Sequence, residues 1–588
     1  MEVYFQLIKD AEALRKACEE LEKYEVLGFD VETTSLDPYD GELRLVQLAT
    51  THNKAQVIDI KAFPNAKTNP DLEPLRKILA SNNSIKIAHN AKFDTKWSKY
   101  HLGVETGNVF DTYLASQLIS AGEQDRRHSL AEVANFFIGQ ELDKTQQISD
   151  WNAELSTEQI EYAAKDAAIM IPLREKMVEK LKQDELENVA DLEFNCVVPI
   201  ISMELTGIFL DKSRWNEQLD KVKKLQIKLA DELQDSLSAG VAQASLFGRA
   251  EINLDSQTQV SDALKNLGVP MPDSTRHWEL QPLAADYPVI AKLLEYRSVQ
   301  KSLTSFGDNI LEFIKPETGR IHADFRQIGA ATGRMSCNKP NLQQIPHADE
   351  YRRCFRGENG RKLIIADYSQ IELRILADFS DDDNFIEAFE SGADFHAITA
   401  SQVFGISAEN VSAEQRSFAK RLNFGVVYGI GAQRFALMTG VSVKEAENMM
   451  RRYFGTYSKL DSYLREAGQN VVKNQLARTA TGRMLRLRIP ENDYKAMASA
   501  KRYGINMPIQ GTSADILKRA LRLLHNGIVG TSARLVNIVH DEIVVEADAI
   551  EAENIALIIE KAMVAAGNEI VRKVPIKVDV KIAEEWAK

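Results

Sequence analysis

Hydrophobic and polar positions follow different patterns in the two parts of the chain. In the first 190 residues, the strand-like runs VLGFDVETT, LRLVQLAT and AQVIDI alternate with segments of helical spacing. This alternation predicts an α/β domain with a boundary near residue 190. Beyond it, the segment from Lys212 to Leu237 has a long helical pattern and is followed by the small-residue run SAGVAQAS. We therefore expect a projecting helical arm with a flexible tip.

Two later segments combine a buried strand with acidic residues. In RKLIIADYSQIELR the run LIIA predicts a strand that ends at Asp367, with helical spacing from Tyr368 onward. In LVNIVHDEIVVE two β-branched runs flank His540, Asp541 and Glu542, as expected for a hairpin with a polar tip. By itself this triplet fits a hairpin tip and a metal site equally well. A second acid at a strand end favours the metal site, because two-metal chemistry needs carboxylates from separate parts of the chain.

The segment AEQRSFAKRLNFGVVYGIG, residues 413–431, predicts a helix with a graded face. At about 100° per residue, side chains four positions apart drift by only about 40°. This face presents two cations followed by two aromatic rings: Arg416, Lys420, Phe424 and Tyr428. Cations suit a triphosphate and a ring beyond them can pack on a sugar or base. The alternative is a solvated basic edge that grades into core aromatics.

Composition describes an ordinary globular chain. The 588 residues, 44% hydrophobic and 27% charged, predict several soluble domains. Charge interrupts the first 20 residues before any signal-peptide core, and no apolar stretch reaches 18 residues, so we expect a protein that is neither secreted nor membrane-bound. The cysteines lack CxxC spacing and predict buried thiols, without disulfides or a zinc site: Cys18, Cys196, Cys337 and Cys354.

The net charge of −13, from 72 basic and 85 acidic residues, argues at first against a nucleic-acid partner. Residues 473–502 nevertheless carry eight basic residues against Glu491 and Asp493, a local balance of +6. A solvated charged face explains such a patch on its own. Phosphate binding gains support only from neighbouring motifs.

A first group of carboxylates lies in the N-terminal part. Asp30 and Glu32 are two apart on a strand and share a face, where they repel unless a cation lies between them. Asn90 with Asp94, and Tyr162 with Asp166, have helical i,i+4 spacing. Four acids on a strand and two helices can bind two divalent metals that activate a water, and Tyr162 is placed to orient it. A lone DVET is more often a polar strand face.

These motifs together resemble known families. The first group resembles the 3′-5′ proofreading exonucleases of the DEDD superfamily, in the version with tyrosine in the last motif. From Asp30 to nearly the C-terminus the chain resembles family A DNA polymerases, the bacterial DNA polymerase I group. The resemblance rests on DYSQIELR, the 413–431 helix, VHDEIVVE, TGRMS (332–336), NLQQIP (341–346), DFH (394–396), TGR (481–483) and NMPIQGTSAD (506–515).

The resemblance implies an α/β and α+β multidomain fold. An RNase H-like 3′-5′ exonuclease domain (1–190) would precede a right-hand polymerase domain (191–588). In the latter, the thumb would span about 212–320, the palm 191–211, 321–380 and 521–588, and the fingers 381–520. The 5′-nuclease domain of many bacterial members is missing from the sequence. The start at Met1 favours a branch that lacks it over a fragment of a longer polypeptide.

The same resemblance implies the roles of individual residues. Each active site would bind two Mg²⁺ ions, which Mn²⁺ could replace. In the exonuclease the metal ligands would be Asp30, Glu32, Asp94 and Asp166, and Tyr162 would contact the nucleophilic water. In the polymerase they would be Asp367, Tyr368 and Asp541, with Glu542 in a supporting role. The triphosphate would be bound by Arg416, Lys420, His396 and Gln370, with Lys420 a proton donor to pyrophosphate. Glu372 would exclude the 2′-hydroxyl, Phe424 would discriminate against dideoxynucleotides, and Tyr428 would stack near the templating base. Arg334, Asn506 and Gln510 would contact the minor groove or backbone near the primer terminus, and Arg502 the duplex or template.

These assignments imply a DNA polymerase of replication or repair with 3′-5′ proofreading. Its partners would be primer-template DNA, deoxynucleoside triphosphates and an unidentified replisome or processivity factor, with no membrane. We expect a monomer in the cytoplasm of a bacterial or phage-infected cell, or in an organelle. The alternatives are a 3′-5′ exonuclease with a non-functional polymerase domain, a nuclease alone, and a DNA-binding relative with dead sites. Gln344, where Asn is common in the family motif, is a mild departure.

Overall fold

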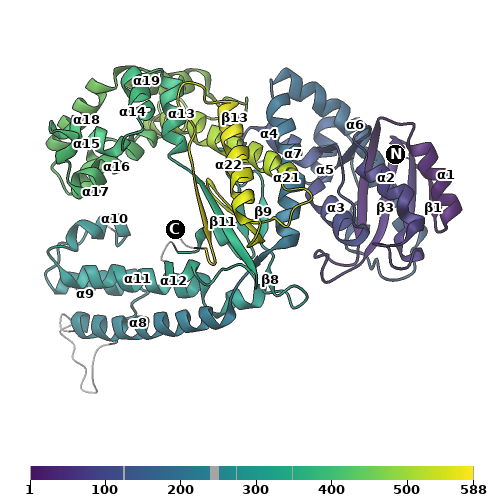
Figure 1. Ribbon diagram of the computed structural model, residues 1–588, viewed down its shortest axis with the longest axis horizontal. Helices are drawn as coiled ribbons and strands as arrows, with labels where there is room; N and C mark the ends of the chain where they lie inside the picture. The colour runs from purple at the N-terminus through teal and green to yellow at the C-terminus, as the bar shows by residue number, and fades with distance from the viewer. Residues whose placement is uncertain (1, 124–125, 239–250, 273, 347–348, 587–588) are drawn as a thin grey trace.

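The computed structural model describes residues 2–586 apart from 124–125, 239–250, 273 and 347–348 (Figure 1). One mixed sheet organises the first domain and one antiparallel sheet the second. The expected flexible tip SAGVAQAS occupies 238–245, and from residue 239 onward it lies outside the described residues.

The first domain is a six-stranded sheet with helices on both faces. Its strand order is β1-β4-β3-β2-β5-β6, in which β3 is antiparallel to both neighbours and the other pairs are parallel. The strands are β1 (Tyr4–Ile8), β2 (Val26–Thr33), β3 (Leu43–Thr51), β4 (Lys54–Asp59), β5 (Ile85–Ala88) and β6 (Val109–Asp111). The helices are α1 (Ala11–Leu21), α2 (Glu73–Ala80), α3 (Ala91–Trp97), α4 (Thr112–Ser120), α5 (Leu130–Ile138) and α6 (Thr157–Gln183). The three predicted strands are confirmed as β2, β3 and β4.

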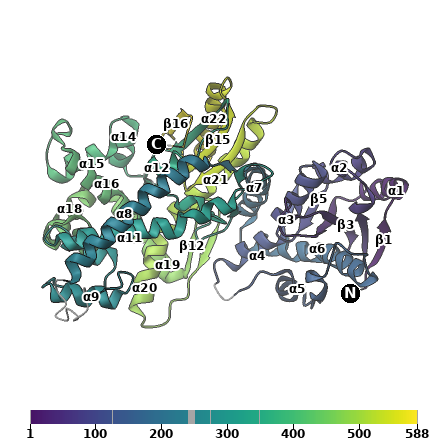
Figure 2. The same cartoon turned by 90° about the horizontal axis from the view of Figure 1, so that it is seen from below.

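Helix α7 (Glu187–Thr206) connects the two domains. Residue 190 lies in its first turn, so the break in secondary structure itself falls at 184–186. Helix α7 packs against α21 (Thr512–Gly527) and β14 (Arg534–Val539) of the second domain, and against α3 of the first. It therefore forms the surface on which the domains meet, as Figures 1 and 2 show at the junction.

The second domain is built on a four-stranded antiparallel sheet of order β14-β15-β11-β16. Its strands are β11 (Arg361–Tyr368), β14 (Arg534–Val539), β15 (Glu542–Asp548) and β16 (Val578–Ala583). Apolar residues of the strands and helices form the core of this domain. Strand β11 is buried between its neighbours, and α22 (Ala552–Asn568) packs across β11 and β16. The short strand pairs are β7 (Ile208–Phe209) with β8 (Arg320–Ile321), β9 (Asp324–Arg326) with β10 (Ser336–Asn338), and β12 (Leu476–Arg478) with β13 (Met484–Arg486).

Two groups of helices extend from this sheet on the side away from the first domain (Figures 1 and 2). One is the arm: α8 (Lys212–Ser238), α9 (Gln257–Asn266), α10 (His277–Leu280) and α11 (Pro288–Phe306). The arm has its own apolar core and confirms the helix predicted from Lys212. The other group comprises α13 (Ile371–Ser380), α14 (Asp383–Glu390), α15 (Phe395–Phe404), α16 (Ala413–Val427), α17 (Ala432–Thr439), α18 (Val443–Thr456), α19 (Ser458–Asn474) and α20 (Tyr494–Asn506).

Two expectations from composition concern the whole chain. All four cysteines are buried and free, as predicted. None of the helices that the structure describes combines the length and apolar character needed to cross a membrane.

Candidate functional site

The first site lies where β2, α3 and α6 meet. Gly28 allows this close approach, because a Cβ atom there would lie 2.0 Å from the carbonyl oxygen of Ala167 on α6. The backbone of α6 therefore packs directly on β2, next to the acidic end of that strand. A cleft of about 1010 Å³ results, lined by all five residues predicted for this site: Asp30, Glu32, Asp94, Tyr162 and Asp166.

Two details of the sequence interpretation change. Asn90 precedes α3 with a φ of 64°, so it does not form the expected i,i+4 pair with Asp94, although both line the cleft. His128 and Trp151, to which the sequence patterns assign no functional role, also line the cleft. A hydrogen bond of 2.9 Å joins His128 Nδ1 and Ser116 Oγ. The Trp151 ring lies 6.4 Å from that of Tyr162, between centroids.

The carboxylates of this cleft repel one another in a desolvated place. Burial raises the pKa of Asp30, Glu32 and Asp94 well above the ordinary range, and the charges of the neighbouring acids raise these pKa values further. Burial also raises the pKa of Asp166, although the charge of Lys144 and its hydrogen bond to Asp166 oppose this rise. The Lys144 ammonium lies 2.8 Å from Asp166 Oδ2 and 3.4 Å from the Tyr162 hydroxyl oxygen. Such a cluster favours cations.

Divalent metal ions fit the chemistry of this donor set, since buried carboxylate oxygens are the ligands that Mg²⁺ prefers. Among the residues that the structure describes, no three acidic, imidazole or thiol side chains already surround one metal position. Asp94 Oδ1 accepts a hydrogen bond of 3.1 Å from the amide of Val31, and Asp166 is paired with Lys144. A metal ion would compete with Lys144 for Asp166, whereas the hydrogen bond from Val31 uses only Oδ1 of Asp94 and leaves Oδ2 for a ligand.

Sequence reasoning missed two residues of this cleft, Lys144 and Asp111. Asp111 is buried at the end of β6, and burial raises its pKa to about 6. It accepts hydrogen bonds from the amides of Asn90 and Ala91, which hold the start of α3, and caps α4. An acid between a strand and a helix was a usable signal. Lys144 precedes a short 3₁₀ turn and has no such signal.

The second site lies at the end of β11. Asp367 is paired in register with Glu542 on β15 and with Asp579 on β16. The amide of Tyr368 donates a 3.3 Å hydrogen bond to the carbonyl oxygen of Asp541. The predicted hairpin is confirmed: His540, with a φ of 58°, and Asp541 form the two-residue turn between β14 and β15. The structure thus brings Asp367 and Asp541 to adjacent strand ends.

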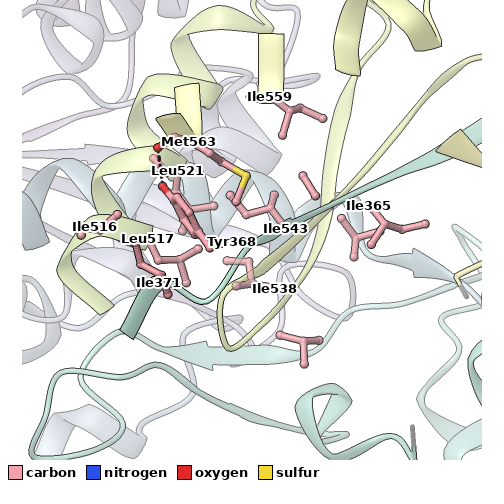
Figure 3. Packing of buried hydrophobic residues seen from close by; sticks show 14 of the residues in the cluster. Ile365, Tyr368, Ile371, Ile516, Leu517, Leu521, Ile538, Ile543, Ile559 and Met563 are labelled. Atoms are coloured by element: carbon pink, nitrogen blue, oxygen red, sulfur yellow. Dashed lines mark hydrogen bonds between the residues drawn. The ribbon is translucent and has the colours of Figure 1, made fainter. Parts of the chain in front are cut away.

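Two assignments at this site need correction. The helix begins at Ile371 rather than Tyr368, which is the last residue of β11. The Tyr368 side chain points into the apolar core, where its hydroxyl donates a 2.7 Å hydrogen bond to the carbonyl of Met563 (Figure 3). It cannot be a side-chain ligand, so any contribution of Tyr368 to a metal must come from its main chain.

Glu542 is buried and supports the site from behind. Its Oε1 accepts a 2.7 Å hydrogen bond from the indole of Trp586 and lies 3.7 Å from a guanidinium nitrogen of Arg352. This agrees with a supporting role and disfavours a catalytic one. Asp579, which sequence reasoning missed, is exposed beside Asp367. The alternation of apolar and polar residues in VDVKIA (578–583) was a signal in the sequence for a strand that exposes Asp579.

Helix α16 carries the predicted graded face. Ser412 and Gln415 form a capping box at its start, and the helix ends at Val427 instead of residue 431. Tyr428 is its C-cap, and Gly429, with a φ of 63°, ends the helix. Arg416 and Lys420 are exposed and Phe424 is half-buried. The Arg416 Nε atom donates a 2.6 Å hydrogen bond to Asp394 Oδ2.

His396 lies beside this face in the first turn of α15. It is 3% exposed, and its ring centroid is 6.0 Å from that of Phe424. Burial, with Arg416 and Lys420 nearby, lowers its pKa to about 4, so the ring is neutral at pH 7. Because the Asn423 amide nitrogen lies 3.0 Å from Nδ1, that atom accepts and the proton resides on Nε2. The ring is therefore a hydrogen-bond donor through Nε2.

Glu372 contacts two other predicted residues, Arg334 and Tyr428. Its side chain accepts hydrogen bonds from the guanidinium of Arg334 and, at 3.4 Å, from the hydroxyl of Tyr428. Burial raises the pKa of Glu372, although both partners oppose this. Gln370, with a φ of 56°, is the N-cap residue of α13 and lies two positions before Glu372. The structure therefore places the end of α16 against the start of α13.

Three of the residues predicted to contact DNA lie on α20 and the π-helical turn after it, Met507–Gly511, whereas Arg334 lies between β9 and β10. Arg502 is exposed, Asn506 is half-buried and Gln510 is buried. Arg502 lies 3.7 Å from the Cβ position of Gly429, next to the end of α16. Gln344 is exposed.

The basic segment 473–502 is only partly a surface patch. Arg483 is buried and paired with Glu193 and Asp515, so it is unavailable to a nucleic acid. The motif TGRMS (332–336) needs its glycine for two reasons. A Cβ atom at Gly333 would lie 2.4 Å from Arg483 Nε, and the φ of Gly333 is 83°. Lys473, Arg486, Arg488, Lys495, Lys501 and Arg502 are exposed.

Comparison with protein-family models gives two matches. Residues 5–182 match the model described as 3'-5' exonuclease, and residues 220–588 match that of DNA polymerase family A. The exonuclease match contains Asp30, Glu32, Asp94, Tyr162 and Asp166. The polymerase match contains Asp367 and Asp541.

Similar proteins extend these matches. DNA polymerase I of Aquifex aeolicus is 33% identical over 99% of this chain and 100% of its own length. The DNA polymerase I proteins of Chloroflexus aurantiacus and Pseudomonas aeruginosa are each 31% identical, and the chain spans 63% and 66% of their lengths. Among solved structures, the POL domain of Pol1 from M. smegmatis, in complex with DNA primer-template and dNTP, has a TM-score of 0.82 at 27% identity, covering 99% of both chains.

Proposed function

Because the chain belongs to DNA polymerase family A and carries a 3′-5′ exonuclease domain, we propose that it extends DNA primers at Asp367 and Asp541 and removes mismatched 3′ ends at the Asp30 cleft. Primer-template DNA and deoxynucleoside triphosphates are its proposed substrates. The observation that carries the proposal is the presence of two separate carboxylate sites, one at the end of β11 and one in the cleft of the first domain.

Family A polymerase and exonuclease domains generally use divalent metal ions. We assign two Mg²⁺ ions, replaceable by Mn²⁺, to each site. Asp367 and Asp541 would hold one pair, and Asp30, Glu32, Asp94 and Asp166 the other. When bound, the ions supply Lewis acidity that favours deprotonation of the attacking oxygen and neutralises charge on the leaving one.

The face of α16 provides the triphosphate site of this proposal. Arg416 exchanges Asp394 for phosphate oxygens, which also accept hydrogen bonds from His396 Nε2 and Gln370. Lys420, one turn farther along, is exposed and donates a proton to the leaving pyrophosphate. Phe424 and Tyr428 then border the sugar and the templating base.

In the exonuclease cleft, the Tyr162 hydroxyl orients the attacking water. Burial and the neighbouring carboxylates raise the pKa of Tyr162, so the hydroxyl stays protonated and can donate a hydrogen bond. The carboxylates Asp30, Glu32, Asp94 and Asp166 bind cations, while Lys144 releases Asp166 for this role.

The test separates the two sites. A labelled primer-template with a 3′ mismatch is incubated with Mg²⁺, with and without the four deoxynucleotides. The unaltered chain should trim the mismatch and extend the primer; Asp367→Ala should trim without extending; Asp30→Ala with Glu32→Ala should retain extension of matched primers but not trimming. Extension by Asp367→Ala would contradict the polymerase site. Trimming alone by the unaltered chain would favour an exonuclease with a non-functional polymerase domain.

A further inference from the structure

Helix α3 carries a catalytic candidate on one side and an ionic contact with the polymerase domain on the other. Lys92 and Lys96 are four residues apart and share a face, whereas Asp94 is about 200° from each around the helix. Asp94 accepts the hydrogen bond from Val31 on β2. The lysines instead reach Glu204 on α7. The helix is thus held between the catalytic strand and the neighbouring domain.

Glu204 is the centre of this contact, which we call the α3 clamp: Lys92, Lys96, Glu204 and Asp324. The side chain of Glu204 is completely buried. Its Oε1 accepts hydrogen bonds of 2.8 Å from Lys92 and from the amide of Phe325, and its Oε2 accepts one of 2.8 Å from Lys96. Lys92 also donates to Asp324 at 2.5 Å and to the Phe325 carbonyl at 2.7 Å. One carboxylate therefore joins α3, α7 and β9.

The complete burial of Glu204 distinguishes the clamp from the other ion pairs between the domains. Lys315 pairs with Asp37 and Asp40, but these two carboxylates are 38% and 55% exposed. His525 pairs with Glu105, which is 42% exposed. Exposed pairs contribute little, whereas removing one partner of a buried pair leaves an uncompensated charge. The clamp is thus the contact whose loss should release α3 most.

The clamp also lies at the edge of the catalytic cleft. Lys92, Asp324 and Phe325 line the same cleft as Asp30 and Asp94. Strand β9 belongs to the polymerase domain, so part of the exonuclease cleft is supplied by the second domain. A shift of α3 away from β9 would move the Asp94 carboxylate relative to β2.

We propose that Lys92 and Lys96 are positioning residues of the exonuclease reaction, through which Glu204 of the polymerase domain holds α3 and keeps Asp94 in place for the reaction. The inference rests on the proposed exonuclease role of the cleft. It makes proofreading dependent on contact between the domains: the exonuclease site is complete only when α3 is clamped. A displacement of about 1 Å in a catalytic group can cost on the order of 100-fold in rate.

The test uses the full chain with Lys92→Met and Lys96→Met combined, and separately Glu204→Gln. The single-turnover rate of digestion of single-stranded DNA should fall by about tenfold or more. The DNA concentration that gives half of the maximal rate should change by less than about twofold. Mn²⁺ titration followed by electron paramagnetic resonance, with Asp367→Asn and Asp541→Asn in every protein to silence the polymerase site, should show weaker binding at the cleft. Extension by the clamp variants without those two changes should be unaltered.

Two controls complete the design. Lys16→Met removes an equivalent charge from the exposed Lys16–Glu12 pair on α1 and should change neither readout. Lys96→Arg preserves the charge and should restore digestion and Mn²⁺ binding relative to Lys96→Met. If the clamp variants digest DNA and bind Mn²⁺ like the unaltered chain, or if extension falls with digestion, the proposal is overturned. If the unaltered chain does not digest DNA, it is the exonuclease assignment itself that fails.

Discussion

At the residue scale, Glu372 is the buried carboxylate that we propose selects the sugar of the nucleotide. It is 8% exposed, and Arg334 and Tyr428 hold its carboxylate from two sides. A carboxylate fixed by two donors cannot swing away from a ligand. At the proposed nucleotide site, a 2′-hydroxyl pointing at Glu372 meets a rigid obstacle.

We predict that Glu372→Ala raises incorporation of ribonucleotides relative to deoxynucleotides by at least about tenfold, because the obstacle is removed. Primer extension with each nucleotide type alone, compared as ratios of kcat/KM, measures the change. Glu372→Gln retains the size of the side chain and should retain most of the discrimination. An unchanged ratio in Glu372→Ala would refute the assignment.

His396 makes a prediction about pH. Its pKa is lowered from 6.5 to about 4 by burial, so between these values the folded chain binds fewer protons than the unfolded chain at this position. Local stability should therefore be complete above pH 6.5 and fall as the pH drops towards 4, by at most on the order of 3 kcal/mol. Hydrogen exchange of the α15 amides at pH 7 and 5 tests this, and His396→Gln should flatten the dependence. Equal pH sensitivity in both proteins would exclude His396 as the cause.

At the scale of elements, the turn between β14 and β15 determines where Asp541 lies. Two residues connect the strands, and His540 adopts the left-handed region that non-glycine residues rarely occupy. This backbone conformation of His540 makes the turn tight enough to bring Asp541 to the end of β11. The adjacent Tyr368–Asp541 hydrogen bond fixes the same relation.

Paired substitutions at His540 should therefore separate backbone from side chain. His540→Gly permits the positive φ and should retain extension, whereas the β-branched His540→Val costs about 1–2 kcal/mol in this conformation and should slow extension severalfold by shifting Asp541. Primer extension measures this, with digestion of single-stranded DNA as the internal control. Equal loss of extension in both variants would indicate that the imidazole, not the turn, is needed.

At the scale of the whole molecule, a buried charge cluster joins distant parts of the second domain. Glu193 on α7 accepts hydrogen bonds of 2.5 Å from Arg483 and from Lys518, and one of 2.9 Å from Gln327. Asp515 shares Arg483 with it. Segments separated by about 300 residues of sequence thus depend on one another's charge.

Glu193→Ala should destabilise this domain by about 3–5 kcal/mol, because Lys518 and Arg483 would lose a buried partner. Differential scanning calorimetry of the full chain should show a lower melting temperature. Lys459→Ala, which breaks the exposed Lys459–Asp383 pair of the same domain, should change stability by less than about 1 kcal/mol. Similar melting temperatures for the two variants would show that the cluster is energetically neutral.

The sequence by itself determined the local elements and most candidate ligands. Period-two and helical spacing correctly predicted β2, β3, β4, β11, the hairpin and α8, because these signals depend on neighbours within a few residues. The motif order identified the family and both groups of acids. The assignment of Asp30 and Glu32 to one strand face needed only the two-residue repeat of a strand.

Only the tertiary structure decided which polar residues are available. It placed Tyr368 in the core, buried Arg483 between two acids and brought Lys144 to Asp166. It also showed Lys92 and Lys96 facing Glu204 across the domain junction. None of these contacts follows from local pattern, because each joins segments far apart in the sequence, and burial and charge pairing are set by what packs against a side chain rather than by what precedes it in the chain.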